Sequence, residues 1–499
     1  MFRKNIALLL CAVILASALG SCGENTADST NETADTADTA AVSAETLSAE
    51  EQKQQEKEAY YAALPAVVEE GADIDFISST WVDISAEELT GQKFNDALYN
   101  RNLEVEEKLG LKVVEHRQDD RSNVLKLVKN NVTAGDGTYD VISTMTNQTA
   151  SMFTSDLLID MNAVPNLQLE GEWWNQSANE NFSFGGVSFC LISSLCQNAD
   201  DVAAIILFNK DMCVDYNIGL PYDDVKEGKW TYDRMWEMVE ALPLDSNGDG
   251  AMDDRDIMGI VGQTQDVQAS MIACGVDFFT KDDNDIPQFI LQTEENVDKF
   301  NKLFDMLTDK TRVCLVDGYK FAGEMAGWTY WSDKFLGGEA LFMLQYPGNM
   351  SSYLEMEADY GVLPMPKYNE EQESYRTMTN TGFTSCLSVP KVHDNDISDI
   401  GLVMEVMSYL SLVDVKPIYI SNYLEQRYIR DEESAEMMML AIETTYYDPG
   451  FAMSEQWSNP MGIPTSVVVS GSNTLISSIE KKVTAIENAI QKTLDAVSE

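Results

Sequence analysis

Apolar and polar stretches alternate in a regular order through the first part of the folded region. Residues 73–82 (DIDFISSTWV) form an apolar run of strand length, and residues 92–110 carry apolar side chains at helical spacing and end at a glycine. Two further strands are predicted at 111–116 (LKVVEH) and 139–145 (YDVISTM), with a helix over 121–134 between them. This β-α-β-α-β order predicts a parallel sheet with helices on its faces.

The alternation continues along the rest of the chain, without an internal repeat. The predicted strands are 203–209, 257–262, 339–344 and 359–363, and the predicted helices are 232–242, 294–309, 396–412, 432–443 and 473–496. The chain has 499 residues, of which 44% are hydrophobic, so it can form two or three domains with a large core. The predicted fold class is therefore α/β.

The first 22 residues have the layout of an export signal. Two basic residues precede the apolar run 6–18, which is too short to span a bilayer. The run ends in Leu19-Gly20-Ser21-Cys22, which resembles the lipobox of bacterial lipoproteins. The resemblance implies that residues 1–21 are a signal peptide, that Cys22 is lipidated, and that the exported protein is anchored to the outer face of the cell membrane. The alternative is an ordinary signal peptide with a chance cysteine.

Residues 22–50 are rich in Thr, Ala, Asp, Glu, Asn and Ser and contain almost no large apolar residue. Such a segment cannot bury enough surface to fold, so it is predicted to be a disordered tether. Residues 48–63 are predicted to form a polar helix that leads into the folded part. After the signal, no stretch of the sequence is apolar enough to suggest a transmembrane segment.

The net charge narrows the range of partners. Lys and Arg number 33 against 83 Asp and Glu, which gives a formal charge of −50. A protein that binds nucleic acid needs a basic surface, and docking on anionic lipid needs one as well. The charge therefore argues against both, and it makes neutral ligands more plausible than polyanionic ones.

Residues 245–256 (DSNGDGAMDDRD) have the spacing of an EF-hand-type calcium loop. Such a loop needs oxygen ligands at alternating positions and a glycine at the sixth position for a sharp turn. The predicted metal ligands are Asp245, Asn247, Asp249, Ala251 through its carbonyl, Asp253 and Asp256. The twelfth position is Asp instead of Glu, whose longer arm suits bidentate ligation. We predict a structural Ca²⁺ and no organic cofactor; the alternative is an acidic surface turn.

Six cysteines follow Cys22, and none of them forms a CxxC pattern. Cys190 and Cys196 are the nearest pair in sequence, but disulfide connectivity cannot be deduced from spacing alone. We expect most of the six to be small, buried apolar residues.

Seven short segments of the sequence occur in the order found in one protein family. They are YDVI (139–142), LLIDMN (157–162), WWN (173–175), LFNKD (207–211), GKWTY (228–232), GEALF (338–342) and YGVLPMPKY (360–368). Each is short, but their order behind a lipobox is similar to that of the bacterial extracellular solute-binding proteins of ABC importers, family 1. Members of that family bind sugars and oligosaccharides, and the resemblance covers about residues 71–470.

The resemblance implies a two-lobed, periplasmic-binding-protein-like fold of type II, with a ligand cleft between lobes that are joined by crossing strands. The implied division is 71–205 with about 360–410 in lobe 1, 206–358 with about 411–470 in lobe 2, and a C-terminal helix over 471–499. The chain is expected to cross between the lobes near 208–210 and 356–363. The implied function is a monomeric binding protein that captures a carbohydrate and delivers it to the permease subunits of an ABC importer.

Candidate ligand contacts come from two arguments. In open α/β sheets, ligands bind beyond the carboxyl ends of the strands, which points to Trp81 and Asn147. Sugars present an apolar face and a ring of hydroxyl groups, so their sites combine flat aromatic side chains with polar ones. The aromatic candidates are Trp173, Trp174, Trp328, Trp331, Trp457 and, by its place in the family, Tyr346. For all of these residues, packing or turn structure is the alternative.

The sequence offers little support for an enzyme. It contains only two histidines, and the motifs of P-loop, serine-hydrolase and zinc-protease sites do not occur where their chemistry would need them. The chain is therefore predicted to be non-catalytic. A secreted glycosidase stays open as an alternative, because such an enzyme needs only two carboxylates. A second alternative is a calcium-braced surface protein that binds other proteins.

Overall fold

The computed structural model describes residues 48–497, apart from 81, 244, 252–254, 317–319, 322–323, 326–328 and 426–427. The chain divides into two compact units, residues 1–66 and 67–499. In the first unit, α2 (Ala49–Ala62) confirms the predicted polar helix. A capping box starts this helix, because Ser48 and Glu51 each accept the backbone N–H of the other. Cys22 lies outside the described residues.

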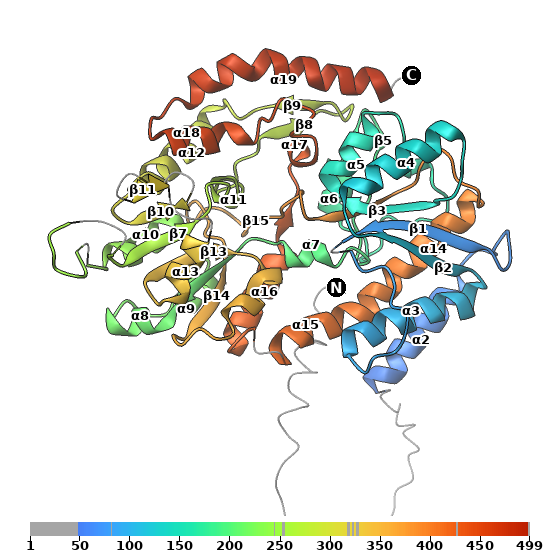
Figure 1. Cartoon of the computed structure of the whole chain (residues 1–499), viewed down its shortest axis with the longest axis horizontal. Coiled ribbons are helices and arrows are strands. Elements are labelled where there is room, and N and C mark those ends of the chain that lie inside the picture. Colours follow the sequence, from blue (N-terminus) through green and yellow to red (C-terminus); the bar gives the residue numbers. More distant parts are fainter. Residues whose placement is uncertain are drawn as a thin grey trace, which may run out of the picture. The chain divides into compact units, whose positions relative to one another are not determined.

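The second unit opens with the predicted parallel sheet (Figure 1). Its strand order is β16-β3-β1-β2, in which β1, β2 and β3 are parallel and β16 is antiparallel to β3. The strands are β1 (Asp73–Ser79), β2 (Lys112–Gln118), β3 (Val141–Met145) and β16 (Ser385–Ser388). The helices between them are α3 (Lys93–Leu109), α4 (Ser122–Ala134) and α5 (Thr146–Phe153). The β-α-β-α-β prediction is thus confirmed.

Apolar stripes hold these helices on the sheet. Val124 and Val128 of α4 and Met152 of α5 pack with Ile77 and Ile142 of the sheet in one buried cluster. α3 packs on β2 and also against a long helical segment made of α14 (Ile397–Leu410), a π-helical turn (Ser411–Val415) and α15 (Lys416–Glu425). Figure 1 shows α4 and α5 on one side of the sheet and α3 and α14 on the other.

A second, five-stranded sheet follows, with the order β10-β7-β13-β6-β14. The strands are β6 (Ile205–Asn209), β7 (Met258–Gly262), β10 (Val313–Leu315), β13 (Ala340–Gln345) and β14 (Tyr360–Pro364). β7 is parallel to β10 and β13, whereas β6 is antiparallel to β13 and β14. The four strands predicted in this region are confirmed. β14 belongs to this second sheet, although the sequence assigned the segment from about residue 360 to the first lobe.

Seven helices of the described chain lie around the second sheet, of which α10, α12 and α16 were predicted and the four shorter ones were not. They are α8 (Lys210–Asp215), α9 (Tyr222–Lys226), α10 (Tyr232–Glu240), α11 (Asp266–Ala273), α12 (Glu294–Leu307), α13 (Tyr330–Leu336) and α16 (Glu432–Glu443). Thr231 caps α10 as expected, because its hydroxyl accepts the N–H of Arg234. α16 packs along β14.

Short elements connect or extend the two sheets. They are η1 (Met161–Ala163), α6 (Gln176–Asn181), β4 (Ser183–Phe184), β5 (Val187–Ser188), α7 (Asn198–Asp201), β8 (Phe279–Lys281), β9 (Pro287–Phe289), β11 (Lys320–Phe321), β12 (Glu324–Met325), η3 (Pro347–Tyr353), β15 (Thr377–Met378), β17 (Thr445–Tyr446), α17 (Pro449–Ala452) and α18 (Gly462–Ser470). The last helix, α19 (Leu475–Val497), confirms the predicted C-terminal helix.

The two sheets are joined by short extended segments that lie side by side. Ala203 forms an antiparallel bridge with Thr379, and the N–H of Ala204 donates to the carbonyl of Met378 at 2.9 Å. β15 pairs in parallel with β17 next to them. The crossings therefore lie near 202–204 and 377–380, and not at 208–210 and 356–363 as the sequence suggested, because those two segments are paired strands of the second sheet.

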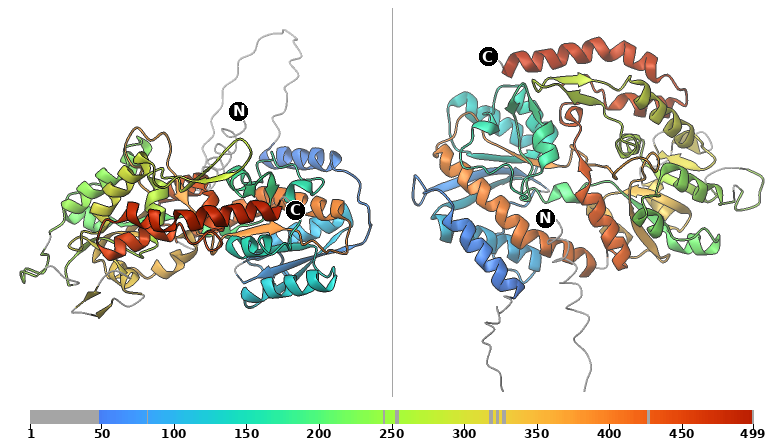
Figure 2. Two further views of the ribbon diagram at one scale, coloured as in Figure 1. Left: turned by 90° about the horizontal axis from the view of Figure 1, so that it is seen from above. Right: turned by 180° about the vertical axis from the view of Figure 1, so that it is seen from behind.

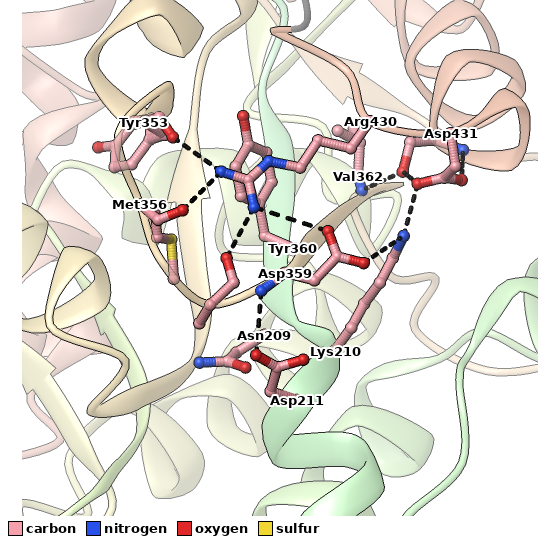
Figure 3. A network of polar contacts seen from close by, with 12 residues as sticks. Asn209, Lys210, Asp211, Tyr353, Met356, Asp359, Tyr360, Val362, Arg430 and Asp431 are labelled. Atoms are coloured by element: carbon pink, nitrogen blue, oxygen red, sulfur yellow. Dashed lines mark hydrogen bonds and ion pairs between the residues drawn. The ribbon is translucent and has the colours of Figure 1, made fainter.

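A polar network fixes the start of α16 on the second sheet (Figure 3). The Arg430 guanidinium donates to two backbone carbonyls of the 353–360 turn, at 2.8 Å each, and lies 4.2 Å from the centroid of the Tyr360 ring. Next to it, the Lys210 ammonium lies 2.6 Å from Asp431 and 3.5 Å from Asp359. Asp431 also accepts the N–H of Ser434 and so caps α16. These hydrogen bonds and ion pairs thus attach the start of α16 to the second sheet.

The cysteines that follow Cys22 lie in the apolar interior of the protein. All six cysteines after Cys22 are buried and none forms a disulfide among the described residues, which agrees with the expectation that most of them are buried apolar residues. Burial raises the pKa of the Cys190, Cys196 and Cys274 thiols, which keeps them protonated. None of the described helices combines the length with the apolarity that a membrane span requires.

Candidate functional site

Polar side chains gather where the parallel strands of the first sheet end. β3 runs directly into α5, so Asn147 lies in the first turn of that helix, half-buried, with its N–H 3.4 Å from the carbonyl of Thr381. Arg121, which follows β2, donates to the carbonyl of Gly382 at 3.0 Å. The side-chain oxygen of Asn147 is buried and has no hydrogen-bond partner among the described residues.

In the second sheet, two further polar side chains, Tyr346 and Asp266, lie at the carboxyl ends of β13 and β7. Tyr346 follows β13 directly and is buried, and Asp266 starts α11 a few residues after β7. Burial raises the pKa of Tyr346, and the nearby Asp266 carboxylate adds to the effect. The Tyr346 hydroxyl makes no hydrogen bond of normal geometry within the described part of the chain, although the side chain of Asn380 lies close to it.

The segment 380–384 connects these two groups. It approaches the first sheet through Thr381 and Gly382 and the second through Asn380, whose N–H donates to the carbonyl of Val202 at 3.3 Å. Phe383 in the same segment is 37% exposed, and the Arg121 guanidinium lies 5.3 Å from the centroid of its ring. We define the junction site as Arg121, Asn147, Tyr346, Asn380 and Phe383.

The chemistry of the junction site suits a neutral polar ligand. Buried polar atoms in folded proteins nearly always have a partner, so the free oxygens of Asn147 and Tyr346 call for a water molecule or a ligand. An amide, a phenol and a guanidinium can bind hydroxyl groups, and the Phe383 ring offers an apolar face. The two histidines lie elsewhere: His116 bonds to Asp75 at 2.6 Å, and the ring of His393 contacts the carbonyl of Asn395.

Of the residues predicted from sequence, the structure brings Asn147 and Tyr346 to the junction site. Trp174 is buried instead, and its ring N–H donates to Glu405 at 2.9 Å. Trp173 is half-buried and meets the ring of Tyr409 edge-on, with centroids 5.3 Å apart. The two neighbours thus both pack near α14.

The other aromatic candidates also lie in the interior. Trp457 is fully buried between Phe184 and Phe279, and its ring N–H donates to Thr493 at 3.1 Å. Trp457 does lie in an irregular turn between α17 and α18, as the sequence indicated, but its contacts are those of a core residue. Trp331 packs in the core of the second sheet. Trp81 and Trp328 lie outside the described residues.

Sequence reasoning missed Arg121, Asn380 and Phe383. No element was predicted between 364 and 395, and the aromatic search was confined to tryptophans and one tyrosine. The stretch TNTGFTS (379–385) does carry a usable signal, because a single large aromatic stands there among small and polar residues beside a glycine. The same cue had selected Trp328 and Trp331.

The acidic loop 245–256 folds around two of its predicted ligands. The Asp245 carboxylate accepts the N–H groups of Gly248, Asp249 and Gly250 at 2.8–3.0 Å. Asp256 is buried and accepts the N–H of Ser246 at 2.9 Å. Both glycines have positive φ, as a sharp turn requires. Asp253 lies outside the described residues, and within the described part no three acidic, histidine or cysteine side chains form a metal-holding cluster. Calcium binding stays a prediction.

Comparison with known proteins identifies the fold. No protein-family model matches the chain, and no curated protein matches it in sequence. Solved structures do match over most of their length. The cyclic α-maltosyl-1,6-maltose binding protein from Arthrobacter globiformis is 12% identical, with a TM-score of 0.57 over 86% of this chain and 100% of its own. The maltose-binding periplasmic protein MalE from Listeria monocytogenes, solved with maltose, is 15% identical, with a TM-score of 0.54 over 85% and 98% of the two chains.

This chain has the periplasmic-binding-protein fold. A third structure, the GacH receptor of Streptomyces glaucescens, which was solved with and without acarbose, agrees at 16% identity, a TM-score of 0.51 and coverage of 85% and 99%. The two sheets described above are the two lobes of this fold, and the expected fold class is confirmed. The junction site therefore lies at the crossing between the lobes, where both sheets present the carboxyl ends of parallel strands.

Proposed function

We propose that this protein is a non-catalytic binding protein that captures a carbohydrate at the junction site and delivers it to the permease subunits of an ABC importer. The observation that carries the proposal is the convergence, on segment 380–384, of polar oxygens without a hydrogen-bond partner among the described residues and of an exposed aromatic ring, at the crossing of a periplasmic-binding-protein fold. Of the three structures compared above, one was solved with maltose, one was solved with acarbose, and one is named for the cyclic maltose-type sugar that it binds.

Binding would follow the hinged closure of this fold class. Asn147 and Arg121 belong to the first lobe and Tyr346 to the second, so a sugar that contacts all three holds the lobes together. The neutral ligand also agrees with the overall charge of −50, which disfavours polyanions. We further propose that the Cys22 lipid tethers the protein outside the membrane and that Ca²⁺ in loop 245–256 braces the second lobe.

A glycan panel tests the proposal. The full-length mature protein is mixed with maltose, maltotriose, cyclic maltodextrins, cello-, xylo- and manno-oligosaccharides, and its melting temperature and the sugar composition are followed. A rise in melting temperature with at least one glycan, without any hydrolysis product, is the expected result. Release of shorter sugars would instead support the glycosidase alternative, and no shift with any glycan would leave a protein-binding surface as the better explanation.

A further inference from the structure

Two hairpins from different lobes meet at their turns, beyond the crossing segments; the start of β8 is bonded to Asp448, two residues after β17. The β4–β5 hairpin turns at Gly185-Gly186 and belongs to the first lobe: Asn162 donates to the carbonyl of Gly186 at 3.0 Å, and Asp160 accepts the N–H of Ser188. The β8–β9 hairpin belongs to the second lobe, because Asn296 of α12 donates to the carbonyls that flank it at 2.8 and 3.0 Å. Figures 1 and 2 show β8 and β9 reaching toward β5 under α19.

The turns of the two hairpins interlock through polar contacts. The N–H groups of Gly185 and Gly186 donate to the carbonyl and the carboxylate of Asp285, at 2.9 and 3.0 Å. In the opposite direction, the Lys281 ammonium donates to the carbonyl of Glu180 and to both oxygens of Ser183, at 3.1 and 3.3 Å for the latter. Lys281 also pairs with Asp285 and is only 12% exposed. Each hairpin thus both donates hydrogen bonds to the other lobe and accepts hydrogen bonds from it.

An apolar layer lies beneath these polar contacts. The Trp457 ring stands 5.1 Å from Phe184 of β4 and 5.1 Å from Phe279 of β8, centroid to centroid, and all three side chains are buried. Leu494 of α19 covers Gly185 at contact distance. Separating the hairpins would expose parts of these large aromatic rings to water, and this exposure opposes separation.

We propose that β4–β5, β8–β9 and Trp457 form a permanent second attachment between the lobes, which we call the hairpin brace. Together with the crossing strands, the brace gives the lobes two fixed points, so they move by rotation about the line that joins these points. A hinge of crossing strands alone would also allow the lobes to twist and slide. The brace limits this freedom and keeps the groups of the junction site in register in the ligand-free protein.

Hydrogen exchange and X-ray scattering on the ligand-free mature protein test the brace. In the wild type, the amides of Gly185 and Gly186, read out in the peptide 183–189, are expected to exchange as slowly as those of β3, because Asp285 accepts both N–H groups. In Lys281→Met, which keeps the apolar stem but removes the ammonium, exchange of this peptide is expected to rise about tenfold or more, with a broader distribution of interatomic distances in scattering. Lys302→Met is the matched control, since its ammonium bonds to Asp233 and the carbonyl of Tyr368 within one lobe.

Asp285→Gly provides an independent variant. Asp285 has a φ of +62°, which glycine adopts readily, so this change removes the carboxylate without straining the turn. It is expected to reproduce the effect of Lys281→Met. Fast exchange of 183–189 in the wild type, or unchanged exchange and scattering in both variants, would overturn the proposal. Because no sugar is used, this result is independent of the glycan panel.

Discussion

At the scale of single residues, the junction site depends on buried polar atoms that make no hydrogen bond of normal geometry with the part of the chain that the structure describes. The hydroxyl of Tyr346 is the clearest case, because it is enclosed at the end of β13. A buried hydroxyl without a hydrogen bond destabilises the folded state, and a ligand that bonds to it recovers that cost. The ligand-free protein and the complex should therefore respond to its removal in opposite directions.

Tyr346→Phe tests this reasoning. The variant is expected to melt at the same or a higher temperature than the wild type without sugar, because the unpaired hydroxyl, which costs about 1–3 kcal/mol, is gone. Its affinity for the glycan identified in the panel is expected to fall about tenfold. Differential scanning calorimetry and titration calorimetry give the two values. A loss of stability together with unchanged affinity would show that the hydroxyl is part of the folded core only.

Phe383 supplies the aromatic face of the site. Phe383→Ala is expected to weaken glycan binding about tenfold or more, since stacking contributes about 0.5–1.5 kcal/mol beyond the apolar area that is lost. The melting temperature should change little, because the ring is 37% exposed in the ligand-free protein. Leu354→Ala, which removes a similarly exposed apolar side chain of the second lobe, is the control and should leave affinity intact.

At the scale of elements, the charged side chains in Figure 3 attach the start of α16 to the second sheet. Burial alone would raise the pKa of Asp431, but hydrogen bonds from Lys210 and Ser434 outweigh it and hold that pKa below its ordinary value. A lowered pKa in the folded state means that the ionised group stabilises the fold. This contribution is present above the unfolded pKa of about 4 and is lost as the pH falls through the folded value.

Lys210→Met is expected to reduce the free energy of unfolding by about 1–3 kcal/mol at pH 7, because it leaves a half-buried carboxylate without its cation. The difference from the wild type should shrink as the pH falls from about 4 through the lowered folded pKa of Asp431, below which this carboxyl group is protonated in both proteins. Urea unfolding at several pH values measures it. Lys226→Met is the matched control, since Lys226 also pairs with α16 but is 42% exposed, and its removal should leave the free energy of unfolding nearly unchanged. Equal losses in the two variants at every pH would contradict this account of α16.

The loop 245–256 offers a second test at this scale. Millimolar Ca²⁺ is expected to raise the melting temperature, and a chelator to reverse the rise; saturation at about a hundred times Kd corresponds to about 2.7 kcal/mol. Asp253→Ala should abolish the shift, whereas Asp254→Ala, which removes the same charge from a position that is not a predicted ligand, should retain it. Identical melting with Ca²⁺ and chelator would leave the loop as an acidic turn held by Asp245 and Asp256.

At the scale of the whole molecule, the sequence predicted the elements well and their connections less well. Local patterns were enough to predict many elements: apolar periodicity indicated α3, α12 and α19, and apolar runs indicated β1, β3 and β13. The crossing at 377–380 could not be found in this way, because it is an extended segment of small polar residues whose partner, Ala203, lies about 175 positions earlier in the chain. The burial of Trp457 depends likewise on Phe184 and Phe279, which no local pattern links.

The site was predictable only where local sequence and topology coincide. Asn147 was found because it follows a recognisable strand of a parallel sheet, and strand ends in such sheets carry ligands. Phe383 and Arg121 were missed because their proximity arises from a turn between strands of the two lobes. An exposed aromatic in such a turn is visible only after the fold is known.

The last prediction concerns how the whole molecule is held at the cell. A surface with a charge of −50 is repelled by anionic lipid, so retention at a membrane requires a covalent anchor. Expressed with its full leader in a bacterium that processes lipoproteins, the wild type is expected in the membrane fraction, and Cys22→Ala in the soluble exported fraction. Cys11→Ala, which changes the cysteine inside the apolar run, is the matched control and should stay membrane-bound. Membrane retention of Cys22→Ala after a high-salt wash would contradict the anchor and leave the fold and the junction site unaffected.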